Sequence, residues 1–155
     1  MLGSPGLAAT EPLSDPRVFV LWNALEGIRG VLYSEGTTSY GKGNPFEAIG
    51  SGDYILLYPG PNGPIPSARL EQLRDGIEDW AILNAVRLRR GSAVVRRILG
   101  SAGLFNASAD GVKLACTTGC DVRSRTKFAW PVYSHDATTP ARVDAAHLQA
   151  LQLAS

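Results

Sequence analysis

Glu78 and Asp79 are the only adjacent acidic residues in this chain, and paired carboxylates are a frequent basis of acid and base catalysis. Such a pair works when the two carboxyl groups have different environments. Here both residues lie in the middle of a strongly predicted helix, where contacts with Arg74 or Arg69 would hold them on a solvated face. We therefore predict a structural role for the pair and assign it no catalysis.

Cys116 and Cys120 are the only two cysteines, and three residues separate them. They could close a small disulfide loop, which would suit an exported protein. Zinc is the alternative, with His135 and His147 as further ligands, although the spacing is not that of a zinc finger. We predict the disulfide, and we predict no metal and no cofactor.

The charge balance gives no sign of a polyanionic partner. The 15 basic and 14 acidic side chains leave a formal charge of +1. Nucleic acid is not expected, because no recognised motif or aromatic interleaving accompanies the basic cluster. Basic residues near a helix C-terminus commonly offset the helix macrodipole, and this role explains the basic cluster without a nucleic-acid partner. The cluster consists of Arg87, Arg89, Arg90, Arg96 and Arg97.

No segment approaches the roughly 18 uninterrupted apolar residues of a membrane helix, so a membrane partner is not expected. The first 15 residues lack a basic start and a continuous apolar stretch, which argues against a signal peptide. They are expected to form a flexible lead-in or the cut edge of something longer.

The elements that would position functional residues alternate in type. Apolar residues at helical spacing predict a short helix from about Asp15, ended by Gly27 or Gly30. The apolar runs 30–34 and 54–58 predict buried strands. Between them, residues 36–52 are rich in glycine and predict a long loop, which is uncommon in a compact domain unless it is functional.

The segment from Ser67 to Gly91 predicts the best-supported helix. Ser67 suits the N-cap and Gly91 the C-terminal end. Gly76 should cost about 1 kcal/mol relative to alanine, and we expect it to allow close approach of the helix to a sheet. The predicted buried stripe consists of Leu70, Leu73, Ile77, Trp80 and Ala81.

The remaining chain predicts a small α+β extension. Residues 93–104 suit a short helix, and 111–116 and 127–130 suit short strands. A last helix is expected from about Pro140, with Thr139 as a candidate cap. Its apolar side would carry Val143, Ala146, Ala150 and Leu153.

Three linked blocks resemble a stretch near the end of the catalytic domain of glycoside hydrolase family 123. They read GDYILLYPG, GPIPSARLE and LRDGIEDW, in order and closely spaced, over residues 52–80. The resemblance is strong over about residues 18–90. Tyr33-Ser34 stands where the family more often has a Tyr-Trp pair.

The resemblance implies an α/β fold: the C-terminal portion of a (β/α)8 barrel, with its last two strands and last helix. A complete barrel takes roughly 250 residues, so the chain is expected to be a C-terminal piece that needs the upstream remainder of the barrel. On this basis residues 1–15 are the lead-in, 16–91 the barrel part, and 92–155 the extension.

The family implies retaining hydrolysis of β-linked N-acetylhexosamine, in which the sugar's own acetamide attacks the anomeric carbon. An adjacent Asp-Glu pair orients the acetamide and protonates the leaving oxygen. The chain has no Asp followed directly by Glu, so the catalytic pair would lie upstream and the isolated chain would be inactive.

Barrel active sites lie at the C-terminal ends of the strands. The resemblance therefore points to five residues as glycan contacts, with ordinary packing as the alternative for each tyrosine: Tyr33, Glu35, Tyr40, Tyr58 and Asn62. The expected function is that of a glycosidase piece acting on N-acetylgalactosaminides, secreted or extracytoplasmic. The alternative is a non-catalytic carbohydrate-binding or scaffolding module.

Overall fold

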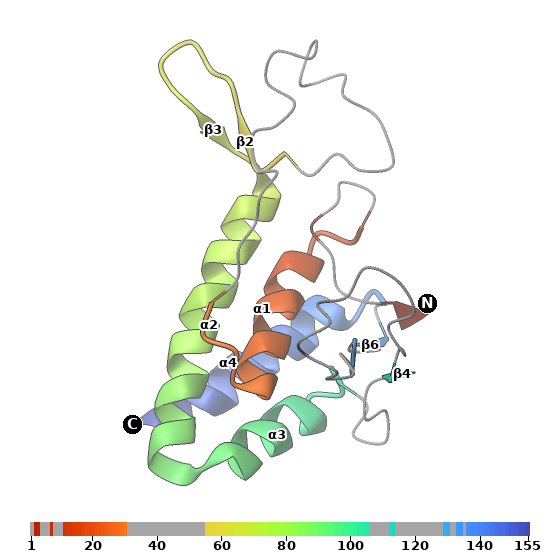
Figure 1. The fold of residues 1–155 in the computed structure, drawn as a ribbon, viewed down its shortest axis with the longest axis vertical. Helices are drawn as coiled ribbons and strands as arrows, with labels where there is room; N and C mark the ends of the chain where they lie inside the picture. The colour runs from red at the N-terminus through yellow and green to blue at the C-terminus, as the bar shows by residue number, and fades with distance from the viewer. Residues whose placement is uncertain are drawn as a thin grey trace, which may run out of the picture.

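A computed structural model of the chain describes residues 2–3, 7, 11–30, 55–105, 112–113, 129–130, 133–134 and 136–155. Within these ranges the architecture is mostly helical (Figure 1). The helices are α1 (Asp15–Glu26), α2 (Ala68–Arg90), α3 (Ser92–Ser101) and α4 (Thr139–Ala154). None of these helices is long and apolar enough to cross a membrane.

The strands in the described ranges are two residues long and pair in antiparallel ladders. β2 (Leu57–Tyr58) pairs with β3 (Ile65–Pro66), β1 (Leu2–Gly3) with β6 (Tyr133–Ser134), and β4 (Val112–Lys113) with β5 (Ala129–Trp130). Mostly helical structure with small sheets is compatible with a piece of an α/β fold. Of the predicted strand 54–58 the structure describes residues 55–58, and of these Leu57 and Tyr58 form a ladder.

Local signals explain where the helices begin and end. The Ser67 side chain accepts a hydrogen bond from the backbone N–H of Leu70 at 3.1 Å, so the predicted N-cap is confirmed. α1 ends at Gly27 and α2 at Gly91, both with positive φ. At α4 the prediction is one residue late, because Thr138 is the N-cap and Thr139 accepts from the backbone N–H of Asp136.

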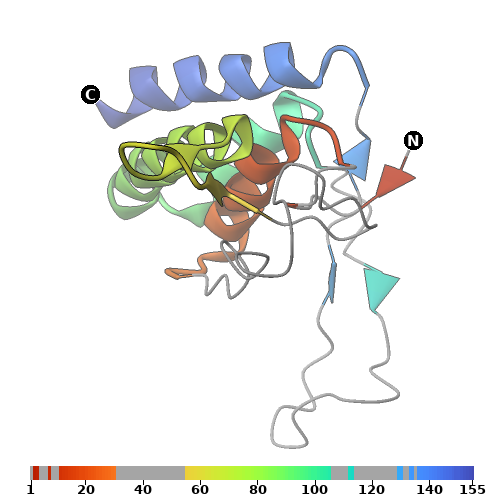
Figure 2. The same ribbon diagram turned by 90° about the horizontal axis from the view of Figure 1, so that it is seen from above.

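One hydrophobic core joins all four helices. α4 lies as a separate layer over the other three helices (Figure 2). The core includes Val18, Leu21, Leu83, Val86, Val95, Ile98, Leu99, Val143, Ala146 and Ala150. The predicted inner side of α4 is therefore confirmed.

The arginines that end α2 contact a different helix from the one that carries them. Arg90 donates to the carbonyl of Leu153 at 3.0 Å, and Arg89 donates to the carbonyl of Ala154. Both carbonyls belong to the last turn of α4, where cations interact favourably with the helix dipole. The predicted macrodipole role thus includes the C-terminus of a neighbouring helix.

Candidate functional site

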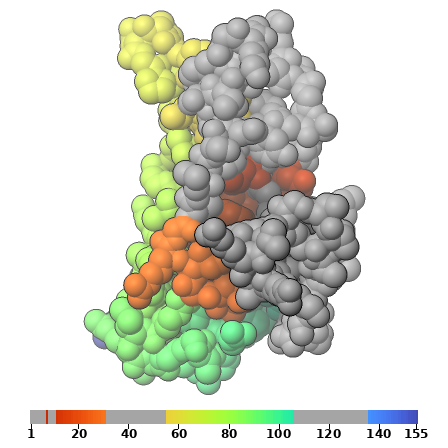
Figure 3. Space-filling model, viewed as in Figure 1, coloured from red at the N-terminus to blue at the C-terminus, as the bar shows by residue number. Residues whose placement is uncertain are grey.

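Part of the predicted glycan site lies on a hairpin at the N-terminal end of α2. In the ladder Leu57 is opposite Pro66 and Tyr58 is opposite Ile65. The hairpin projects beyond the helices (Figures 1 and 3), and residues 61–66 are exposed. The resulting surface lies away from the helical core and is accessible to a large ligand.

Gly60 is required by the geometry of this turn. A Cβ at position 60 would lie 2.5 Å from the Gly63 carbonyl oxygen and 2.7 Å from Cγ1 of Ile65. Four prolines at 59, 61, 64 and 66 further restrict the backbone. Both features restrict the backbone conformations that the hairpin can adopt.

Two of the predicted glycan contacts lie in the described residues. Tyr58 is half-buried at the end of β2, and Asn62 is exposed in the turn. The structure brings both to the same hairpin. The other three, Tyr33, Glu35 and Tyr40, lie outside the described residues, as do the cysteines of the predicted disulfide, Cys116 and Cys120.

A second cluster of polar groups connects three helices, and it corrects the prediction for Asp79. Asp79 is only 2% exposed. Its carboxylate accepts hydrogen bonds from Arg17 Nε at 2.7 Å and Arg17 Nη2 at 3.2 Å, and it lies 2.6 Å from His147 Nδ1. Glu78 and Asp79 therefore do not lie together on a solvated face, because Glu78 is exposed and Asp79 is buried.

The contacts expected within α2 also differ. Arg74 bonds Glu71 at 2.6 Å instead of residue 78 or 79. The partners of Asp79 come from α1 and α4, 62 and 68 residues away in the sequence. Local spacing carries no signal for pairs so distant.

The cluster is electrostatically matched to its surroundings. Burial disfavours the charge of Arg17, but the hydrogen bonds and negative charge of Asp79, with a further contribution from Asp144, raise the pKa of Arg17 above its ordinary value. Asp144 bonds Arg17 Nη1 at 3.0 Å from a largely exposed position. The arginine therefore stays charged and ties α1 to both α2 and α4.

The geometry gives this cluster a structural role. The Asp79 carboxylate is closed to solvent and already holds three hydrogen bonds, so no ligand can reach it. Among the described residues there is no group of three or more metal-ligating side chains. His147, a conceivable zinc ligand from the sequence, instead contacts Asp79 through Nδ1.

The inner face of α2 differs from the predicted stripe. Its buried residues are Gly76, Asp79, Leu83 and Val86, whereas Ile77 is 57% exposed. Gly76 lies against α1 and not against a sheet: a Cβ there would lie 3.0 Å from Cβ of Val20. The glycine does permit close approach, and the neighbouring element is a helix.

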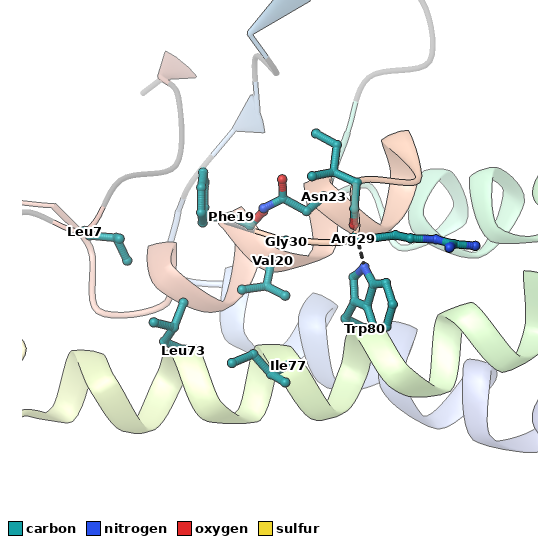
Figure 4. Close-up of a pocket in the computed structure, with 10 residues that line it drawn as sticks. Leu7, Phe19, Val20, Asn23, Arg29, Gly30, Leu73, Ile77 and Trp80 are labelled. Atoms are coloured by element: carbon teal, nitrogen blue, oxygen red, sulfur yellow. Dashed lines mark hydrogen bonds between the residues drawn. The ribbon is translucent and has the colours of Figure 1, made fainter. Parts of the chain in front are cut away.

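Much of the predicted stripe instead lines an apolar cavity of about 330 Å³ between α1 and α2 (Figure 4). Leu73, Ile77 and Trp80 form one wall, and Phe19 and Val20 form the opposite one. The indole N–H of Trp80 donates to the carbonyl of Ile28 at 2.9 Å. Trp80 thereby fixes the turn that follows α1.

Comparison with known proteins gives a family match for the central segment. Residues 32–86 match the catalytic domain of glycoside hydrolase 123. This match confirms the predicted resemblance. A search of curated proteins and one of solved structures give no match.

Within the described residues, the glycoside hydrolase 123 match includes the β2–β3 hairpin and α2 up to Val86. It also includes Gly76 and Asp79, which dock against α1. Helix α1 itself lies before the match begins. The matched segment thus packs against helices that lie outside the match.

Proposed function

We propose that residues 32–86 form the closing βα unit of a (β/α)8 barrel in a glycoside hydrolase that acts on β-linked N-acetylhexosamine, with N-acetylgalactosamine as the preferred sugar. The match over residues 32–86 carries this proposal. A complete barrel takes roughly 250 residues. The partner that completes the site is therefore an upstream part of the barrel.

In this proposal the hydrolysis is substrate-assisted and retaining. The acetamide oxygen attacks the anomeric carbon, an acid protonates the leaving oxygen, and water then opens the cyclic intermediate. The Asp-Glu pair for these steps is not in this chain, which contains no Asp followed by Glu. Its own contribution is binding: Tyr58 and Asn62 contact the glycan at the rim, with Tyr33, Glu35 and Tyr40 on the same rim.

The hairpin supports a rim position. It is exposed, rigid and rich in proline, and it joins the end of β2 to the start of α2. Loops after barrel strands carry the substrate-binding residues of this architecture. A tyrosine and an amide in such a loop can stack on a sugar ring and hydrogen-bond its hydroxyl groups.

The test combines turnover with binding. The isolated chain should not hydrolyse a chromogenic N-acetylgalactosaminide but should bind N-acetylgalactosamine, seen as NMR shift changes at the hairpin. Asn62→Ala should weaken binding, whereas Gln152→Ala, which removes an exposed amide in the last turn of α4, should not. Turnover by the isolated chain would contradict the placement of the catalytic pair.

A non-catalytic carbohydrate-binding or scaffolding module is the second candidate, favoured by the same lack of an Asp-Glu pair. The two functions differ once a protein that includes an upstream barrel is assayed. Turnover by that protein, abolished by substitution of its Asp-Glu pair, supports the hydrolase. Binding without turnover supports the module.

A further inference from the structure

We propose that Arg69 is a positioning residue for glycan binding: it holds the hydroxyl end of Tyr58 at the rim. This inference rests on the proposed function. Arg69 lies in the first turn of α2, and its Nη2 donates to the carbonyl of Ile55 at 2.9 Å and lies 3.5 Å from the Tyr58 hydroxyl oxygen. One guanidinium thus contacts both the backbone before β2 and the side chain of the last residue of β2.

The backbone of Tyr58 is held independently of this contact. Its register opposite Ile65 fixes it in the hairpin, and the N–H of Ser67 donates to the carbonyl of Leu56 at 2.9 Å. The side chain has a further rotational freedom that the ladder does not restrict. Arg69 acts on that freedom, because it contacts the far end of the ring.

The contacts of Arg69 indicate that it is not there for ion pairing. No carboxylate of the described residues pairs with it. Its Nε is closed to solvent and has no acceptor in the described part of the chain. A buried N–H without an acceptor is unfavourable, so the contacts with the strand end outweigh that cost.

The chemistry defines what Tyr58 offers a ligand. A guanidinium only donates hydrogen bonds, so in this contact the Tyr58 oxygen is the acceptor. The aromatic ring held in this way can pack against the ring of an N-acetylhexosamine. Holding the ring before binding reduces the entropy lost when the complex forms.

A double-mutant cycle on the full chain tests the proposal, with N-acetylgalactosamine as the probe. Arg69→Met and Tyr58→Phe should each weaken binding roughly two- to tenfold, the worth of one hydrogen bond. The double variant should bind no more weakly than the worse single variant, because both changes remove the same contact. Arg74→Met, which removes an exposed arginine of the same helix, is the matched control and should leave binding unchanged.

The ring of Tyr58 supplies a second measurement that needs no sugar. The NMR shifts of the ring should change in Arg69→Met and stay the same in Arg74→Met. The control variant Arg74→Met should also keep the thermal midpoint of the wild type. If Arg69→Met weakens binding in the Tyr58→Phe variant as much as it does in the wild type, the proposal is wrong. It is also wrong if Arg69→Met leaves the ring shifts of Tyr58 unchanged. If the wild-type chain does not bind the sugar but Arg69→Met still changes the ring shifts, the contact between Arg69 and Tyr58 is supported and the proposed function is wrong.

Discussion

At Asp79, three hydrogen bonds converge on a carboxylate that solvent hardly reaches. The donors are two nitrogens of Arg17 and one of His147, from α1 and α4. Charges buried in this way are costly unless they are paired. The pairing explains why a polar residue occupies the inner face of α2.

We predict that Asp79→Ala lowers the free energy of unfolding by about 3 kcal/mol, because it leaves Arg17 buried without its main counter-ion. The adjacent Glu78→Ala changes the same quantity by less than about 0.5 kcal/mol, because Glu78 is exposed. Urea unfolding followed by circular dichroism measures both. Equal midpoints for the two variants would show that the cluster does not stabilise the fold.

Asp79 also shows what sequence reasoning misses at the scale of a residue. The carboxylate, the spacing and the nearby arginines of α2 all favoured a solvated face. The decisive partners lie more than 60 residues away, on helices whose packing a local pattern does not reveal. Tyr58 and Asn62 could be predicted to lie near each other, because they belong to the end of one strand and the loop that follows it.

At the scale of the elements, α1 and α2 approach each other closely at Gly76. A Cβ there would lie 3.1 Å from Cα of Arg17 and 3.0 Å from Cβ of Val20. Neither atom can move by a simple side-chain rotation. Any larger residue must therefore push the two helices apart.

We expect Gly76→Ala to destabilise the protein by about 1 kcal/mol, because the overpacking cost exceeds the gain in helix propensity. Gly100→Ala in α3 is the control: its Cβ would meet nothing within 4 Å, so the propensity gain should remain. Thermal unfolding of the two variants should show midpoint shifts of opposite sign. A stabilised Gly76→Ala would mean that α1 and α2 can separate at little cost.

The helices themselves could be predicted well from the sequence. Capping and breaking residues such as Ser67, Gly27 and Gly91 act locally, and they mark the ends of α1 and α2 as observed. The buried face of α2 could not be predicted, because apolar content favoured Ile77 over Gly76. The β3 strand was missed because its two residues lie in a proline-rich stretch.

For the whole molecule, the described core draws on both ends of the chain. Leu21 of α1 and Leu83 of α2 share it with Ile98 of α3 and Val143 of α4. All four side chains are almost completely buried. Residues on either side of position 91 therefore depend on each other for burial.

We predict that a protein ending at residue 91 loses cooperative thermal unfolding, because the inner faces of α1 and α2 would be exposed to water. The full chain, measured by circular dichroism under the same conditions, is the reference. A truncated protein that melts sharply at the temperature of the full chain would show that α1, α2 and the hairpin are stable alone.

The contact between Arg17 and Asp79 crosses the edge of the glycoside hydrolase 123 match, which begins at residue 32. This has an evolutionary consequence. A homologue that loses the arginine would carry an uncompensated aspartate, so selection should remove or replace the acid as well. Positions 17 and 79 are then expected to covary, although only the second lies in the matched segment.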